Sequence, residues 1–257
     1  MAPWTAFPQL GEFQHDAASI AREWPRLHAG DAEPLPADPE VLAAWVLFHN
    51  GDFRRAADAG LAAGGAGITV ANRATCIYAT HLERQEQARL ALFEEAAGRA
   101  ALQAAAEPHN PNAWYLHAYA LGRYSQGISV ARALAQGLGG KVKESLERTI
   151  QLQPLHAAAH LALGAFHAEV IDKVGTLIGG MTYGARKDTG LKMFAQALAL
   201  HPRSPVAWIE YANGLLMLEG EDKLGEARRL YEKAAAIQPL DAMERLDVER
   251  ARAGLPA

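Results

Sequence analysis

The chain has 257 residues, of which half are hydrophobic and 21% are charged, and this composition excludes a disordered chain. Its formal net charge is -4, so it lacks the basic excess that neutralises phosphates, and nucleic-acid binding is disfavoured. No apolar run of about 18 residues occurs, so no membrane span is expected. The first residues include two prolines and no positive region of a signal peptide, and the single cysteine suits a reducing compartment. Together these features predict a soluble cytoplasmic protein.

Helix is favoured over sheet, because alanine is frequent and β-branched residues are sparse. Residues 1–37 are expected to form an N-terminal segment, with a short helix over 16–28 that is interrupted at Pro25, and then a linker. Three helix starts follow, each with a polar N-cap residue before a proline: Asp38-Pro39, Asn110-Pro111 and Ser204-Pro205. Proline is tolerated at the first helical position because its missing N–H would have no helical acceptor there. The first start predicts a helix over 39–50 with a partner over 53–63, and two further helices are expected over 68–82 and 85–106.

The pattern becomes more regular from residue 107, where helices end at four prolines in turn: Pro108, Pro154, Pro202 and Pro239. The first two intervals leave room for insertions near 122–140 and 168–190, between the two helices of a pair. We expect these insertions to be helix extensions or an added helical turn. A charged helix over 243–252 is expected to close the chain.

One pattern occurs twice within residues 153–239. A helix carries a large residue, a tight pair and another large residue, and the next helix carries an aromatic, an alanine three positions later and a final proline. The two sets are His160, Leu163-Gly164, His167, Phe194, Ala197 and Pro202, and then Trp208, Tyr211-Ala212, Leu215, Tyr231, Ala234 and Pro239. This order resembles the tetratricopeptide repeat (TPR), a helix–turn–helix unit of about 34 residues. The resemblance implies an all-α, right-handed helical-hairpin solenoid (a TPR-like superhelix) over 38–239, with extended or inserted helical segments and a polar C-terminal capping helix in 240–257.

The long insertions are similar to those of one group of TPR proteins, the regulators of microtubule dynamics. The matching segments are Trp114-Tyr115, Leu121-Gly122-Arg123, Lys143-Glu144, Leu163-Gly164 and Phe194–Leu198. The high alanine content indicates a bacterial protein, which does not fit a role on microtubules.

The repeat resemblance implies a non-catalytic scaffold that binds a segment of another protein in a concave groove lined by first helices. The candidate groove residues are Asn112, Tyr115, Tyr119, Arg123, Glu169, Asn213 and Met217, together with Leu161 and Ile209. Tyrosine, arginine and methionine are typical of binding interfaces. The alternative for Tyr115, Tyr119, Leu161 and Ile209 is that they pack between neighbouring helices, as apolar helical stripes usually do.

A small-ligand or metal-binding helical protein, such as an accessory component of a transport system, is the alternative function. Its candidates are the apolar, glycine-bearing segment 174–185 and one helical face with His156, His160 and His167. A histidine pair four residues apart can bind zinc, but His160 and His167 also occupy positions where the repeat places packing residues. We therefore predict no metal and no cofactor. No catalytic motif occurs, so no enzyme is expected.

Overall fold

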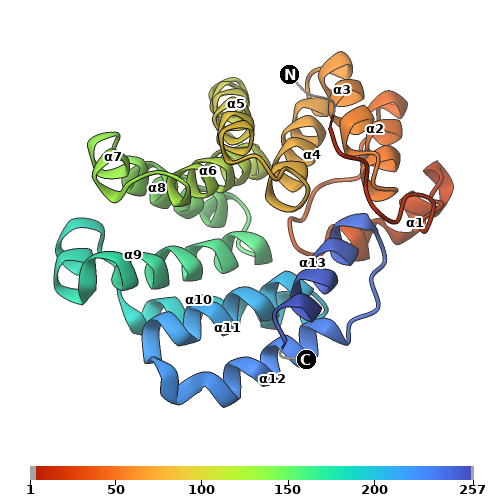
Figure 1. Ribbon diagram of the computed structural model, residues 1–257. Coiled ribbons are helices and arrows are strands. Elements are labelled where there is room, and N and C mark those ends of the chain that lie inside the picture. The colour runs from red at the N-terminus through yellow and green to blue at the C-terminus, as the bar shows by residue number, and fades with distance from the viewer. Residues whose placement is uncertain (1–3, 256–257) are drawn as a thin grey trace. The chain divides into compact units, whose positions relative to one another are not determined.

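The structure of the protein is a computed structural model that describes residues 4–255, and these residues contain helices and no strand (Figure 1). They form two compact units. The first comprises residues 4–28, Glu33–Leu152 and Leu240–Met243, and the second comprises Ala29–Ala32, Gln153–Pro239 and the residues from Glu244 onward. The predicted segments 1–37, 38–239 and 240–257 concern repeats along the sequence rather than compact units, and they stay a prediction.

The first unit is built from helical hairpins. In chain order its helices are α1 (Ala17–Leu27), α2 (Pro39–His49), α3 (Phe53–Ala63), α4 (Gly67–His81), α5 (Glu86–Ala106), α6 (Pro111–Gln126), α7 (Val130–Ala135) and α8 (Leu138–Leu152). Helix α2 packs on α3, α4 on α5, and α6 on α8, while α3 also packs on α4 and α5 on α6. Each hairpin therefore covers the next, which is the packing expected of stacked helical repeats.

The second unit continues the same construction with α9 (Ala157–Tyr183), α10 (Lys187–Leu200), α11 (Pro205–Glu219), a 3₁₀ turn (Glu221–Lys223), α12 (Leu224–Ala235) and α13 (Ala242–Ala253). Helix α9 packs on α10 and α11 on α12, and α11 also packs on α9 and α10. From Glu244 onward α13 belongs to this unit, where buried Ala251 clusters with Ile209 of α11 and Ala234 of α12. The all-α helical-hairpin fold with a closing C-terminal helix is thus confirmed.

The three predicted proline starts are confirmed. The side chain of Asp38 accepts a hydrogen bond from the backbone N–H of Glu40, and the side chain of Asn110 accepts from Asn112 and Ala113. Ser204 accepts from the N–H of Ala207 in the same way. These side chains satisfy N–H groups that have no acceptor within the first helical turn.

The predicted interruption at Pro25 is wrong, because α1 continues through this residue to Leu27. Proline removes one helical hydrogen bond, but this helix buries apolar side chains on both sides of it. Ile20, Trp24 and Leu27 are all buried, so packing outweighs the missing bond.

The two insertions are helical, as predicted. The first contains the short helix α7 between α6 and α8. The second extends α9 to Tyr183, with a break at Gly175, where φ is 80° and ψ is 161°. Only glycine adopts such backbone angles without strain, so Gly175 allows the last turns of α9 to change direction.

The core of the second unit is organised around Phe194 of α10, which is fully buried. Its ring lies between glycines of the two neighbouring first helices. A Cβ atom on Gly164 of α9 would lie 3.0 Å from the ring, and a Cβ on Gly214 of α11 would lie 2.3 Å from it. The ring also stacks on Tyr211, with 5.5 Å between centroids. The repeat therefore needs glycine where the large side chain of one hairpin meets the helices on either side.

Candidate partner-binding surfaces

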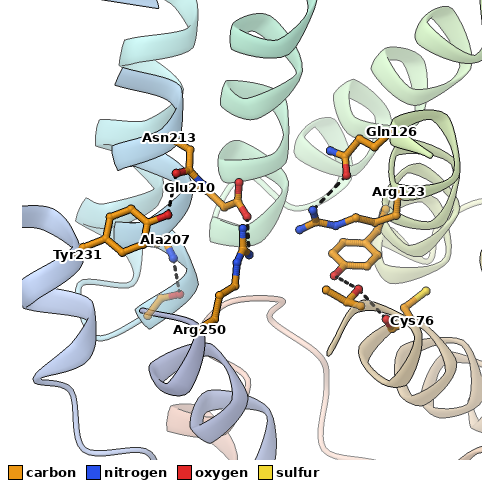
Figure 2. A network of polar contacts seen from close by, with 11 residues as sticks. Cys76, Arg123, Gln126, Ala207, Glu210, Asn213, Tyr231 and Arg250 are labelled. Atoms are coloured by element: carbon orange, nitrogen blue, oxygen red, sulfur yellow. Dashed lines mark hydrogen bonds and ion pairs between the residues drawn. The ribbon is translucent and has the colours of Figure 1, made fainter. Parts of the chain in front are cut away.

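In the first unit, one face of α6 presents Tyr115, Tyr119 and Arg123 at four-residue intervals, which places them in a row along the helix. The Tyr119 hydroxyl lies 2.9 Å from Thr80 Oγ1 of α4. The Arg123 guanidinium lies 5.3 Å from the Tyr119 ring centroid, and Arg123 Nη1 donates to Gln126 Oε1 at 3.2 Å (Figure 2). Tyr119 and Arg123 are half-buried, so each combines fixed contacts with an exposed part.

Tyr115 lies deeper in the same row and is 5% exposed. The Arg73 guanidinium of α4 lies 5.7 Å from its ring centroid, within the range of a cation–π interaction. This position agrees with the alternative prediction that Tyr115 packs between helices. Tyr119 and Arg123 are therefore the more accessible members of the row.

Three arginines lie close enough to the buried thiol of Cys76 to influence it. Burial raises the pKa of the Cys76 thiol to about 12, and the charges of Arg73, Arg99 and Arg123 oppose this rise. Arg99 donates to Asn72, to Thr75 and to Glu95 and is held in place, whereas Arg73 and Arg123 lie over tyrosine rings.

Asn112, a predicted groove residue, is 2% exposed. Its amide donates to the carboxylate of Glu33, within the first unit. In this position Asn112 fixes the segment after α1 to the first turn of α6.

In the second unit, the corresponding face of α11 is joined to α12 and α13. The Tyr231 hydroxyl of α12 donates to Asn213 Oδ1 at 2.8 Å, and Arg250 Nη1 of α13 donates to Glu210 Oε1 at 2.9 Å (Figure 2). Asn213 thus has a structural partner on the second helix of its own hairpin. Met217 is 38% exposed on the same helix, which leaves it as the more accessible predicted contact of this unit.

The remaining predicted groove residues differ in accessibility. Glu169 of α9 is half-buried, and its carboxylate lies 3.8 Å from Lys173 Nζ one turn later. Leu161 is 7% exposed and Ile209 is fully buried. Both belong to core clusters of the second unit, in agreement with the packing alternative.

The three histidines at the start of the second unit have separate partners. His156 caps α9 by accepting from the Ala159 N–H at 3.0 Å, and His160 Nε2 lies 2.9 Å from the carbonyl oxygen of Pro154. His167 Nδ1 accepts from the Arg186 N–H at 3.3 Å. Within residues 4–255, no three His, Cys, Asp or Glu side chains are arranged to hold a metal ion.

The second insertion borders an open cleft of about 670 Å³. Its lining includes Thr176 and Gly180 of α9, together with Arg186, Asp188 and Leu191. On the same turns of α9, Leu177, Ile178 and Met181 are 75%, 59% and 82% exposed. Among residues 4–255 no helix has the length and apolarity needed to cross a bilayer.

Four residues of these surfaces were not predicted from the sequence: Arg73, Thr80, Glu210 and Arg250. Thr80 and Arg73 lie on α4, where the repeat pattern is weakest. Arg250 lies 40 positions from its partner Glu210. Its position in a charged helix indicated exposure rather than an ion pair, so no local signal could have identified the contact.

The helical hairpins give the chain a TPR-like fold. The structure is similar to that of TTC0263, a thermophilic TPR protein in Thermus thermophilus, with a TM-score of 0.59 and 19% identity over 84% of this chain and 98% of that one. Weaker similarities link it to YrrB, a TPR protein with an unusual peptide-binding site (TM-score 0.42, 15% identity, 92% of this chain and 100% of that one). They also link it to an IFIT1 monomeric mutant with Gppp-AAAA (TM-score 0.44, 16% identity, 80% and 51%).

No protein-family model matches the chain, and no curated protein matches it either. The similarity to TTC0263 therefore establishes the fold. The resemblance to the regulators of microtubule dynamics stays a prediction from sequence patterns.

Proposed function

We propose that the protein is a non-catalytic, TPR-like scaffold that binds a segment of another protein, with Tyr119 and Arg123 of α6 as central contacts. One observation supports this most directly. Tyr119 and Arg123 form an ordered aromatic–cationic pair that remains partly exposed on the first helix of a repeat. Tyrosine and arginine are the residues that most often dominate binding energy at interfaces.

The charge of this face favours an acidic partner segment. Arg73 and Arg123 both contribute positive charge near Cys76. An arginine held over a tyrosine ring is already ordered, so a carboxylate that binds it causes little further loss of side-chain entropy. The other predicted contacts, Glu169 and Met217, belong to the second unit, where they would extend the bound surface.

A peptide array with acidic, neutral and basic peptides of equal length tests the proposal on the purified full chain. We expect acidic peptides to bind, with an affinity that falls as salt rises, because surface charges are screened. Arg123→Ala should weaken binding by roughly 5- to 30-fold, the effect of about 1–2 kcal/mol at an interface hot spot.

Arg148→Ala is the matched control. Arg148 on α8 donates to Gln151 at 2.7 Å, three positions later in the chain, as Arg123 does to Gln126. The control therefore removes the same charge and the same kind of contact from another helix. If Arg123→Ala and Arg148→Ala lose the same amount of peptide affinity, the proposed surface is refuted. Peptide binding that is unchanged in the double variant Arg123→Ala, Tyr119→Ala would refute it as well.

The proposed compartment is the cytoplasm of a bacterial cell. Cys76 is a buried free cysteine that forms no disulfide in the fold, so the protein requires no oxidising environment.

A second candidate function, binding of a small molecule, is favoured by the cleft beside the second insertion. Its volume of about 670 Å³ lies in the range of ligand pockets. Native mass spectrometry and metal analysis of the purified chain would separate the two functions. A stoichiometric bound molecule that Gly180→Leu displaces would support this candidate, and a protein without one would count against it.

A further inference from the structure

The segment Leu240–Met243 belongs to the first unit, although the residues before it, Gln153–Pro239, belong to the second. Two histidines hold it there. His15 Nε2 lies 3.0 Å from the carbonyl oxygen of Leu240, and His49 Nδ1 lies 2.7 Å from Asp241 Oδ2. The His49 and Asp241 side chains are each only 1% exposed, so this hydrogen bond is enclosed by protein.

A third histidine extends the connection to α1. His49 Nε2 lies 3.2 Å from Nε2 of His28, which follows the last residue of α1. Two tryptophans enclose the pair: Trp24 stacks on His28 with 4.0 Å between ring centroids, and Trp45 lies 5.6 Å from His49. The Asp241–His49–His28 chain therefore joins the C-terminal ends of α1 and α2 to a distant segment of the sequence.

Whether the hydrogen bond between His49 and His28 can form depends on how many protons the two imidazole rings carry. A hydrogen bond between two ring nitrogens needs one nitrogen with a hydrogen and one with a free lone pair. When His49 is neutral and donates from Nδ1 to Asp241, its Nε2 accepts from His28. When His49 alone is protonated, Nε2 donates to His28 instead. When both imidazoles are protonated, both Nε2 atoms carry hydrogens, the bond is lost and two like charges face each other.

The surroundings make the protonated form of His49 unfavourable. Burial lowers the pKa of His49, and the carboxylate of Asp241 only partly opposes this shift. The neighbouring His28 and His15 lower the pKa of His49 further. His15 itself behaves differently, because a protonated imidazole can still donate to the carbonyl oxygen of Leu240.

We propose that the Asp241–His49–His28 chain is an acid-sensitive clasp, closed at neutral pH and opened between His28 and His49 when both imidazoles are protonated. Opening separates the end of α1 from α2 and weakens the attachment of Leu240–Met243. For each proton taken up on opening, the open-to-closed ratio rises by up to about tenfold per pH unit below roughly 6.5.

Hydrogen–deuterium exchange on the full chain, corrected for the intrinsic effect of pH, tests the proposal. Between pH 7.5 and pH 5.0 we expect faster exchange in peptides from the end of α1 and from residues 240–243, while the circular-dichroism signal of helix is retained. Unchanged exchange in both peptides, or loss of all helical signal over the same pH range, would overturn the proposal.

His28→Gln provides the sharpest variant. A glutamine amide offers both a donor and an acceptor, so it can bond to His49 Nε2 in either protonation state, and the clasp should stay closed at pH 5.0. His117→Gln is the control, because His117 is another partly buried histidine of the first unit, with Ser145 Oγ at 2.9 Å. This variant should open as the natural chain does.

Asp241→Asn gives an independent result if His28→Gln does not fold. The amide oxygen still accepts from His49 Nδ1, but the negative charge that favours a protonated His49 is gone. Without this charge the closed form holds a proton on His49 even less well, while a solvated His49 in the open form is little affected. Opening should therefore shift to higher pH. A shift to lower pH, no shift, or a His28→Gln protein that opens like the natural chain would each contradict the clasp.

Discussion

Gly214 provides the most direct test of how the repeats pack. A Cβ atom added there would lie 2.3 and 2.4 Å from ring carbons of Phe194, whereas carbon atoms in contact normally lie about 3.5–4.0 Å apart. The ring would have to retreat by more than about 1 Å. It is fully buried, and it is already close to Gly164 and Tyr211 on other sides, so no free space is available.

Gly214→Ala should therefore lower the free energy of unfolding by about 1 kcal/mol, and by no more than about 2.5 kcal/mol. This figure combines an overpacking cost of about 1–3 kcal/mol with a gain of about 0.5–1 kcal/mol, because alanine favours helix over glycine. Urea denaturation followed by circular dichroism would measure the change.

Two further variants separate overpacking from other effects. Gly98 is exposed on α5, where an added Cβ meets nothing within 4 Å, and Gly98→Ala should stabilise the protein by about 0.5–1 kcal/mol. Adding Phe194→Leu to Gly214→Ala should cost less than the sum of the two single changes, because the shorter side chain makes room. A Gly214→Ala protein as stable as Gly98→Ala would refute the argument.

Three other predictions follow from burial and capping. Burial lowers the pKa of both His49 and His117, so the unfolded chain binds more protons at acid pH than the folded chain does. The free energy of unfolding should therefore be constant above about pH 6.5 and fall below it, by up to about 1.4 kcal/mol per pH unit for each histidine. A stability that rises on acidification would contradict this. Because burial raises the pKa of Cys76 to about 12, iodoacetamide should modify it only after unfolding, and rapid labelling of the native chain at pH 8 would show the thiol to be accessible. Asn110→Ala should cost about 1 kcal/mol because the first N–H groups of α6 lose their cap, and thermal unfolding that matches the natural chain would show that this cap contributes nothing.

Much of the fold could be predicted because its signals are local. The side chain of a polar residue before a proline accepts hydrogen bonds from backbone N–H groups of the first helical turn. The helix starts at Asp38, Asn110 and Ser204 were therefore identified from neighbouring residues alone. Pro25 shows the limit of such reasoning: its local penalty was clear from the sequence, but the burial of Trp24 and Leu27 that outweighs it depends on distant helices.

The candidate surfaces could be predicted only in part. Helical spacing placed Tyr115, Tyr119 and Arg123 in one row, but it could not distinguish the buried Tyr115 from the more accessible pair. Asn213 lay at the expected position on its helix, yet its bond to Tyr231 depends on how α11 and α12 are rotated about their axes. That rotation is set by side-chain packing.

The sequence by itself determined where the helices start, how they repeat and that large residues alternate with small ones, because these features depend on turns and on a 3.6-residue period. The tertiary structure alone decided which polar groups meet. His28, His49 and Asp241 share no local pattern, and 192 positions separate the last two. Their contact arises because burial removes water from these polar groups, so that each of them needs hydrogen-bond partners within the fold.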